Sequence, residues 1–337
     1  MEKKFDYKDK DKNIITYEVF VNDLKQTIDY KITNPTKPVV PEFLYKYYSL
    51  NSNSIDAVIN SYLFLSHPFS LNDKYDCDIN LIDYPELDCE DYIRYLVDLY
   101  NYYSKDEVIR LFESKNRNKL SYKLGELHQI EIFKKNGIIS LTENPNDILM
   151  WSYYTQNSGF AIKLNAKKLT ENLNGYGPFP INYVEKLDNI SFTEYNYALC
   201  VLYQTNIKQE IWKPENEWRY FIYNPTGNFH PFYSNSDINS RKRPYDLSIV
   251  DEIILGYDFF KPDEIDFDKR TKEYDIINVN LKECEKIMFL NFIVKNNVSC
   301  RQIIRDRFQY LLDLRDMIIE QLSPNKFKIY NSFKNID

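Results

Sequence analysis

The sequence predicts an α+β fold in which helices are inserted into a twisted sheet of mixed or antiparallel strands. Short runs of β-branched and aromatic residues recur at residues 43–48, 137–142 and 160–164. Residues 86–135 instead repeat their apolar side chains with helical spacing. Only seven glycines are present, and none belongs to a Gly-x-Gly-x-x-Gly or Walker loop, which excludes Rossmann dinucleotide binding and P-loop NTPase chemistry.

Charge and composition narrow the class of protein further. The net charge of -7 comes from interspersed acidic and basic residues, a pattern that argues against a dedicated nucleic-acid surface. Five scattered cysteines without a Cys-x-x-Cys pair indicate free thiols in a reducing compartment, and three histidines without i,i+4 spacing predict no metal site. The first residues are charged and no apolar run is long enough to span a membrane, so we expect a soluble, cytoplasmic protein.

Three regions follow from the order of the elements. Residues 1–42 form an N-terminal arm with a strand at 15–21 and a proline-rich connection that ends near Glu42. We expect residues 43–280 to form one α+β domain of a catalytic type. Residues 281–337 are predicted to be a helical C-terminal extension.

The predicted domain begins with alternating strands and short helices. A strand at 43–48 and a helix that carries Ile55 and Val58 precede a second strand, 63–66, and a polar loop, 70–76. In this loop Asn72 and Asp73 either form turns with their own backbone or contact a ligand.

An aromatic turn follows the helical region. The strand 137–142 leads into a short helix, 148–154, and then into the strand 160–164. Two aromatic side chains of that helix, Trp151 and Tyr154, are either a stacking wall for a planar ring or a hydrophobic plug.

The rest of the chain adds strands at 181–184, 250–255 and 274–279 and a helix at 195–208. For residues 299–322 the apolar spacing predicts a helix that begins at a Ser299–Gln302 capping box and ends before Pro324. This helix either packs on the domain or pairs with another copy or a partner subunit.

Residues 212–223 concentrate the most chemistry, with two carboxylates, two indoles and an arginine. In an extended chain Glu215, Glu217 and Arg219 share one face. Two carboxylates on one face repel each other, which raises the pKa of one of them into a range useful for acid/base catalysis. The alternative is an edge strand that exposes these charges to solvent.

Four segments together resemble a bacterial family catalogued as domain of unknown function 2971. They are residues 44–47, residues 64–66 with 71–76, residues 140–162, and the Trp-x-x-Glu-x-Glu-Trp-Arg element at 212–219. The chain departs from the family pattern at Leu71 and Lys74 in the polar loop, and it has Tyr154 where a histidine is common. Membership of this family implies no particular reaction.

The order of the segments is also similar to the ADP-ribosyltransferase fold. That resemblance places Glu217 at the catalytic glutamate and Glu215 at the residue that orients the acceptor. It places Lys46 or Tyr47 and then Ser66 against NAD, with Trp151 and Tyr154 as an aromatic wall. The remaining residues expected to contact NAD are Asn72, Asp73 and Arg219.

The function implied is that of a bacterial toxin or phage-defence effector that transfers the ADP-ribosyl group of NAD or hydrolyses NAD. The carboxylate stabilises the oxocarbenium-like centre formed when the nicotinamide bond breaks. The acceptor, a protein or a nucleic acid, stays open. One alternative is a non-enzymatic sensor or interaction module of an anti-phage system. Another is a metal-dependent nuclease that uses Asp73, Asp76 and Glu217 as ligands.

Overall fold

A computed structural model describes the backbone of residues 3–8, 14–22, 27–32, 40–114, 116–173, 175–187, 189–192, 197–223, 238–271, 274–305 and 312–332. Side chains are described from residue 40 onward within these ranges, except at 69, 131–134, 197–199, 223 and 267–268.

An 11-stranded mixed sheet organises the described part of the chain. Its strands lie in the spatial order β16 (Ile265–Arg270), β17 (Tyr274–Asn280), β20 (Lys326–Ser332), β19 (Leu312–Ser323), β18 (Ser299–Arg305), β15 (Val250–Leu255), β8 (Phe160–Asn165), β4 (Phe43–Tyr48), β7 (Asn136–Thr142), β13 (Glu217–Tyr223) and β9 (Tyr176–Pro180). The pair β15–β18 is parallel and the other pairs are antiparallel.

Smaller sheets and the helices surround it. The small sheets pair β1 (Lys3–Lys8), β2 (Ile14–Asn22) and β3 (Thr27–Ile32); β5 (Tyr62–Phe64) and β14 (Lys242–Pro244); β6 (Ile82–Asp83) and β11 (Ile190–Ser191); and β10 (Asn182–Val184) and β12 (Ile207–Gln209). The α-helices are α1 (Ser52–Ile59), α2 (Cys89–Tyr92), α3 (Lys105–Glu113), α4 (Arg117–Lys135), α5 (Ile148–Thr155), α6 (Ala166–Asn172), α7 (Tyr197–Thr205) and α8 (Cys284–Asn296). A π-helical segment, η3 (Ile93–Leu99), continues α2, and the 3-10 turns are η1 (Pro68–Ser70), η2 (Ile79–Leu81), η4 (Glu210–Glu215), η5 (Asn239–Arg241), η6 (Leu247–Ile249) and η7 (Pro262–Glu264).

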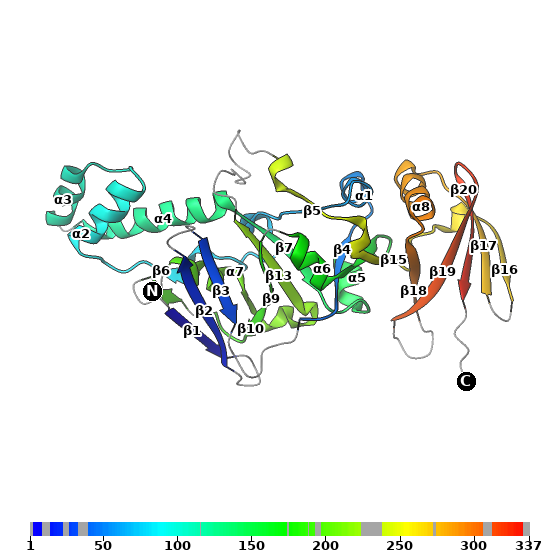
Figure 1. Ribbon diagram of the computed structural model, residues 1–337, viewed down its shortest axis with the longest axis horizontal. Coiled ribbons are helices and arrows are strands. Elements are labelled where there is room, and N and C mark those ends of the chain that lie inside the picture. Colours follow the sequence, from blue (N-terminus) through cyan, green and yellow to red (C-terminus); the bar gives the residue numbers. More distant parts are fainter. Residues whose placement is uncertain are drawn as a thin grey trace.

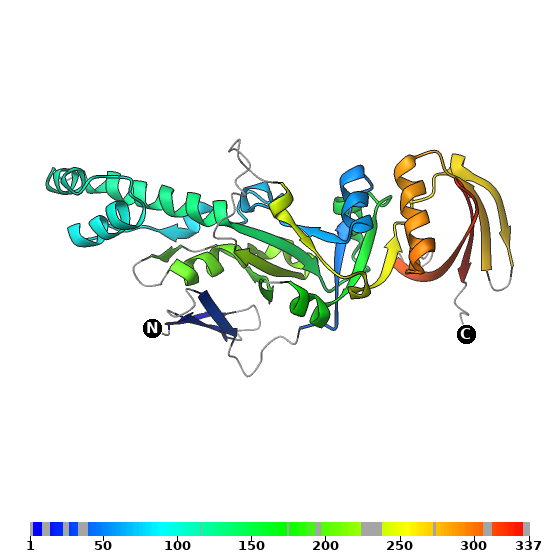
Figure 2. The same cartoon turned by 45° about the horizontal axis from the view of Figure 1, so that its top comes forward.

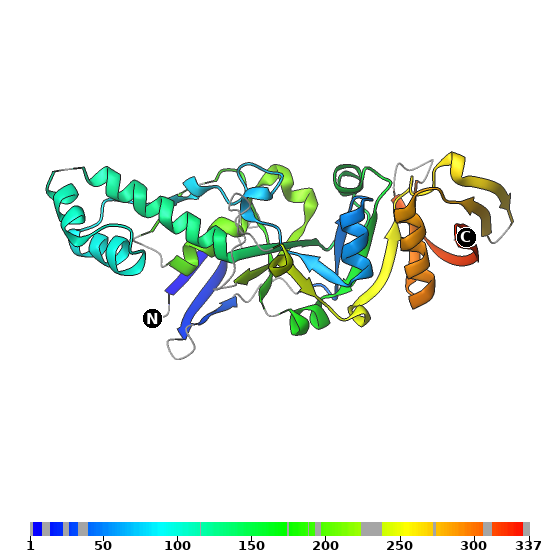
Figure 3. The same ribbon diagram turned by 90° about the horizontal axis from the view of Figure 1, so that it is seen from above.

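The molecule is elongated along the sheet. Helices α2, α3 and α4 form an arm at one end, and α8 with strands β16–β20 forms the other end (Figures 1 and 3). The strands β1–β3 lie beside the central sheet as a separate layer (Figure 2). One buried apolar cluster nevertheless connects the central strands with the C-terminal end of the molecule. It contains Phe160 on β8 and Phe289 on α8, whose rings lie 4.3 Å apart.

The central sheet is almost split between β4 and β7. These strands share one paired position, Tyr45 with Thr142, whereas β4 pairs with β8 along its whole length. Further along β7, Ile138 exchanges both backbone hydrogen bonds with Ser66, which follows β5. The carbonyl of Ser140, between those two pairs, accepts instead from the Lys46 side chain at 2.9 Å. A pocket lies at this interruption.

Several predicted elements are confirmed. Strands lie at 43–48, 136–142, 160–165, 250–255 and 274–280, and helices at 52–59 and 148–155. The strand predicted at 15–21 is β2, which pairs within the separate three-stranded sheet. The α+β class with a large mixed sheet is therefore correct.

The predicted helix at 299–322 is wrong. Residues 299–305 and 312–323 are strands β18 and β19, and residues 306–311 lie outside the described residues. A spacing of four residues returns to the same face of a helix, but as an even number it also returns to the same face of a strand. The predicted pattern also contains three-residue intervals, from 308 to 311 and from 315 to 318, which fit a helix and not a strand, so pairing with β15 and β20 outweighs the local spacing. Pro324 lies in the turn between β19 and β20 rather than at a helix end.

Candidate functional site

The predicted site residues gather around one pocket of about 230 Å³. It is bounded by β4, β7 and β13, by the loop after β5, and by α5, β12 and η4. The lining residues are Tyr45, Lys46, Tyr47, Ser66, Ser70, Leu71, Asn72, Asp76, Ser140, Leu141, Thr142, Met150, Tyr154, Lys208, Glu215, Glu217 and Arg219. Eight of the ten predicted residues are among them, and the two that are not are Asp73 and Trp151.

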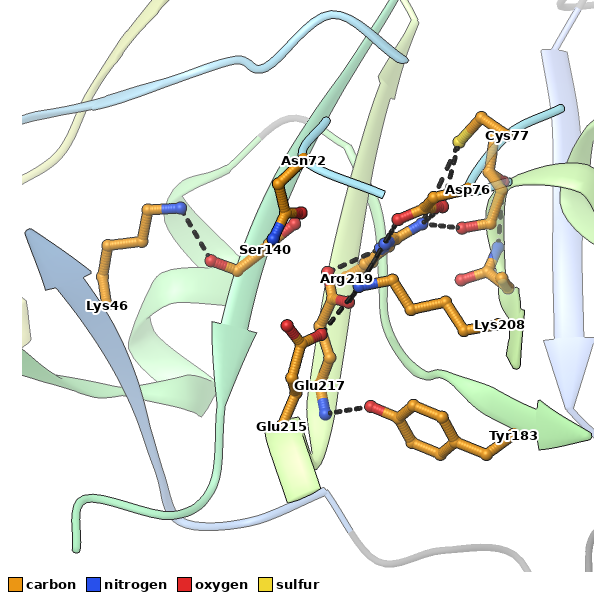
Figure 4. Close-up of polar contacts among 12 residues, drawn as sticks. Lys46, Asn72, Asp76, Cys77, Ser140, Tyr183, Lys208, Glu215, Glu217 and Arg219 are labelled. Carbon is orange, nitrogen blue, oxygen red and sulfur yellow. Dashed lines mark hydrogen bonds and ion pairs between the residues drawn. The ribbon is translucent and has the colours of Figure 1, made fainter. Parts of the chain in front are cut away.

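Arg219 joins two carboxylates that are far apart in sequence (Figure 4). Its Nε and Nη2 donate to the two oxygens of Glu217, at 2.6 and 3.0 Å. Its Nη1 donates to Asp76 Oδ1 at 2.8 Å and to the carbonyl of Thr205 at 2.6 Å, and Nη2 donates to Asp76 Oδ2. All five N–H groups of the guanidinium are therefore engaged within the protein. Arg219 acts as a buried counterion and has no donor left for a ligand.

Lys208 completes this carboxylate cluster. Its ammonium lies 2.7 Å from Glu215 Oε2, 2.8 Å from Glu217 Oε2 and 3.4 Å from Asp76 Oδ2. The Lys208 side chain is buried, and its three N–H groups have three carboxylate neighbours. We call Asp76, Lys208, Glu215, Glu217 and Arg219 the carboxylate cluster.

Glu215 and Glu217 reach Lys208 from different elements. Glu215 ends the 3-10 turn η4, Asn216 follows in the left-handed conformation with φ 41°, and β13 begins at Glu217. The carbonyl of Glu215 accepts from the Thr142 hydroxyl at 2.6 Å, and the backbone N–H of Glu217 donates to the Tyr183 hydroxyl at 2.9 Å. These bonds fix both carboxylates against the sheet.

Two sequence-based expectations for this segment need correction. Glu215 does not share a strand face with Glu217 and Arg219, because the left-handed Asn216 interrupts the extended chain. The alternative of a solvent-exposed edge strand is also wrong, since β13 lies between β7 and β9 and all three charged side chains are buried.

The pKa values of the two glutamates are shifted in opposite directions. Burial would raise the pKa of Glu217, but Arg219 and Lys208 more than offset this effect and hold that pKa well below its usual range. Burial raises the pKa of Glu215, Glu217 raises it further, and Lys208 together with the Tyr154 hydrogen bond opposes the rise. One pKa of the pair is raised, that of Glu215, and burial is the larger cause, with repulsion from Glu217 as a smaller one.

Glu215 is also the cluster carboxylate with the fewest partners. The Tyr154 hydroxyl donates to its Oε1 at 2.5 Å, and Lys208 contacts its Oε2. The Asn72 amide in turn donates to the Tyr154 hydroxyl at 3.0 Å. An ionised carboxylate has about four acceptor positions, so Glu215 retains acceptor capacity while it lines the pocket.

Lys46 lies across the pocket from the carboxylate cluster, on the β4 side of Ser140 (Figure 4). Its one hydrogen bond within the described part of the chain goes to the Ser140 carbonyl, which β4 leaves unpaired. Burial lowers the pKa of Lys46 to about 8, an effect that Glu217 opposes and Arg219 reinforces. This ammonium therefore bridges the split in the sheet and faces the pocket.

The aromatic residues divide between wall and core. Trp151 is buried, its Nε1 donates to the Pro145 carbonyl at 2.8 Å, and it packs edge-on against Tyr47 at 5.0 Å. Tyr47 lines the pocket, and its hydroxyl donates to the carbonyl of Asn144. Tyr154 reaches the pocket as well. Of the two aromatic side chains, Tyr154 lines the pocket, whereas Trp151 is the hydrophobic plug of the two sequence-based alternatives.

Of the predicted polar residues in and before the loop at 70–76, some line the pocket and one does not. Ser66 and Asn72 line the pocket, whereas Asp73 is buried outside it. Asp73 Oδ1 accepts from the backbone N–H of Tyr75 at 2.9 Å, the turn-forming arrangement that was one of the two sequence-based alternatives.

Sequence reasoning missed Lys208 and assigned Asp76 only to the nuclease alternative. Lys208 lies on the three-residue strand β12 directly after α7, and nothing in its local sequence marks it. Glu215 follows Lys208 by seven residues, and this spacing alone does not predict that their side chains meet. The Asp76–Arg219 pair spans 143 residues, a separation that only the folded chain reveals.

Comparison with known proteins locates one related segment. Residues 150–220 match the sequence model of a family described as protein of unknown function (DUF2971). The matched segment runs from α5 to the first half of β13 and contains Tyr154, Lys208, Glu215, Glu217 and Arg219. No curated protein and no solved structure in the comparisons matches the chain.

Among the described residues, no group of three or more His, Cys, Asp or Glu side chains is placed to hold a metal ion. Within the same ranges, each helix is too short or too polar to cross a lipid bilayer.

Proposed function

We propose that the pocket is the active site of an enzyme that breaks the nicotinamide glycosidic bond of NAD and passes the ADP-ribosyl group to water or to an acceptor. One observation supports this proposal most. Glu215 is a pocket-lining carboxylate with free acceptor capacity, oriented by Tyr154 and Lys208 and backed by a fixed charge cluster. A carboxylate so placed stabilises positive charge as it develops on a sugar ring.

The roles of the two glutamates are then opposite to those that the fold resemblance implies. Glu217 has both oxygens on Arg219 and a third contact to Lys208, so it holds the framework. Glu215 faces the substrate and either stabilises the sugar cation or accepts the proton of the attacking hydroxyl.

The size of the pocket limits what enters it. Pockets that enclose a drug-sized ligand measure about 300–1,000 Å³, whereas this one measures about 230 Å³. It accommodates only the part of NAD around the reacting sugar, and the remainder of the molecule lies outside. Tyr154 and Met150 from α5 form the apolar side against which the ring would pack.

The proposal is tested by incubating the protein with NAD labelled separately in its adenine and nicotinamide halves, with and without cell lysate. Hydrolysis releases free ADP-ribose, transfer leaves the adenine label on a macromolecule, and both release nicotinamide. We expect Glu215→Gln to abolish release and Glu210→Gln, a change at the other end of the same turn, to leave it unchanged. An inert wild-type protein, or full activity in Glu215→Gln, would contradict the proposal.

A toxin or phage-defence role is the setting we propose for this reaction. Depletion of NAD or modification of an essential acceptor would stop growth when the protein is expressed. The same Glu215→Gln and Glu210→Gln pair tests this setting: toxicity should disappear in the first variant and persist in the second.

A binding module without chemistry is the second candidate. The saturated donors of Arg219 and Lys208 favour it, since a rigid framework serves recognition as well as catalysis. It predicts that Glu215→Gln keeps biological activity while changes in the pocket wall abolish it.

The geometry does not favour a metal-dependent nuclease. Asp76 and Glu217 converge, but on the guanidinium of Arg219, and Asp73 lies outside the pocket. Activity that persists in a chelator would separate the proposed reaction from this alternative.

A further inference from the structure

The part of the pocket that extends from β4 to the loop after β5 carries hydrogen-bond donors that the protein does not use. Lys46 lies on β4, Ser140 on β7, and Ser66 pairs with β7 on the side that faces β4. Ser70 and Asn72 reach the same pocket from the loop after β5. We call these five residues the donor wall.

The hydrogen bonds of the donor wall show which of its donors are free to bind a ligand. An ammonium group carries three N–H donors, and Lys46 uses one of them, on the Ser140 carbonyl. Within the part of the chain that the structure describes, the hydroxyls of Ser66, Ser70 and Ser140 make no hydrogen bond to protein. Asn72 gives one amide N–H to the Tyr154 hydroxyl and keeps the other.

The charges of the pocket make Lys46 the available cation. Within the described residues three cations line the pocket. Two of them, Lys208 and Arg219, direct their N–H groups to the carboxylates of Asp76, Glu215 and Glu217. Lys46 has no carboxylate within ion-pair distance in that part of the chain. A cation beside unused hydroxyls is the arrangement that binds phosphate and carboxylate oxygens in proteins.

We propose that the donor wall binds an oxyanion group of the ligand, a phosphate or a carboxylate, with Lys46 as its cationic anchor. The pocket then orients its ligand by two opposite ends, the oxyanion at Lys46 and the hydroxyl-bearing end at Glu215. This inference deepens the proposed function by naming a chemical group of the substrate, and it rests on that function only for the identity of the end at Glu215.

The oxyanion has two possible sources, which direct binding measurements distinguish. Inorganic pyrophosphate and ADP-ribose represent a nucleotide, and malonate represents a small carboxylic acid. Isothermal titration of the full chain with each probe should show binding to one of the two classes. Tight binding of the phosphate probes alone assigns the subsite to a nucleotide, and of malonate alone to a carboxylic acid.

Variants of the donor wall test its role. Lys46→Met should weaken binding of the preferred probe about 10- to 100-fold, as expected for the loss of a charged hydrogen-bond donor. Lys46→Arg should retain most of the affinity because it keeps the charge. Lys74→Met removes a positive charge from the exposed part of the same loop, outside the pocket, and should have no effect.

A folding defect in Lys46→Met would not leave the inference undecided. Ser70→Ala changes an exposed loop residue of the wall and should weaken binding severalfold without loss of stability. Equal affinity in wild type, Lys46→Met and Ser70→Ala, or no binding of any probe by the wild type, would overturn the inference.

The proposed function and this inference fail in different ways. If the wild type and Glu215→Gln bind an oxyanion but neither releases nicotinamide, the reaction is wrong and the donor wall stands. If the wild type releases nicotinamide and Lys46→Met does so with an unchanged KM, the reaction stands and the donor wall is wrong.

Discussion

Arg219 looks like a ligand clamp in the sequence and is a counterion in the structure. Its guanidinium holds Glu217 and Asp76 and also a backbone carbonyl, that of Thr205, so it joins three separate parts of the chain. Removing one partner from such a buried network leaves charge without compensation, which costs about 3–5 kcal/mol. Substitutions in the carboxylate cluster should therefore lower the free energy of unfolding.

Glu217→Gln should destabilise the protein by about 3–5 kcal/mol at pH 7, because Arg219 and Lys208 lose a buried partner. The folded-state pKa of Glu217 is depressed, so the ionised group contributes stability above the unfolded-state pKa of about 4.3 and loses it as the pH falls below that value. The difference between wild type and variant should shrink in acid. Urea unfolding at pH 7 and pH 4 measures it, with Glu210→Gln as the matched control.

Tyr154→Phe should raise the pKa of Glu215. The Tyr154 hydroxyl stabilises the ionised carboxylate by a hydrogen bond of 2.5 Å, and its loss leaves burial and Glu217 to favour the protonated form. Infrared titration of the carboxyl band that disappears in Glu215→Gln measures this pKa without a substrate. Tyr153→Phe, which changes the exposed neighbouring ring, should not move the band; an equal shift in both variants would contradict the assignment.

At the scale of elements, sequence patterns predicted strands β4, β7, β8, β13, β15 and β17 of the central sheet and missed β9, β16, β18, β19 and β20. Residues 43–48, 136–142 and 160–165 are largely buried runs, and their β-branched and aromatic residues favour strands. The helix predicted at 299–322 failed because pairing with β15 and β20 outweighs its local helical spacing. The turn at Asn216 was also missed, since a single left-handed residue leaves no periodic signal, although asparagine is among the residues that tolerate it.

Asn216→Val should cost about 1–2 kcal/mol, because a β-branched residue resists the left-handed conformation that separates η4 from β13. Asn216→Gly should be tolerated. Thermal unfolding of the two variants measures the difference. Equal stability in both would show that the turn does not require a left-handed residue.

The whole molecule depends on contacts that no local pattern encodes. Eight of ten predicted site residues line the pocket, four of them on strands β4 and β13 and the others on the loop after β5, on α5 and on η4. The Asp76–Arg219 pair, the split between β4 and β7, and the role of Lys208 arise from how distant segments meet. The gathering of these residues at one pocket was thus predictable from sequence, whereas their division into framework and pocket-facing groups was not.

A chain that ends at Asn280 should fail to fold as a soluble protein. The segment after it was predicted to be an extension, but β18 pairs with β15 and β20 pairs with β17, so its removal leaves two unpaired strand edges. It also removes Phe289 and Phe327 from the main apolar cluster. Expression and gel filtration of the shortened chain check this, and a monodisperse, folded product would show that the rest of the sheet is autonomous.

The most direct test of the account compares Glu215→Gln with Glu217→Gln in a single experiment that records nicotinamide release from NAD and the thermal midpoint. The account predicts that Glu215→Gln loses release and lowers the midpoint less than Glu217→Gln does, because Lys208 keeps Glu217 and Asp76 as partners. It predicts that Glu217→Gln has a clearly lower midpoint and still releases nicotinamide at temperatures where it is folded. A stable but inactive Glu217→Gln together with an active Glu215→Gln would reverse the assigned roles and contradict the account.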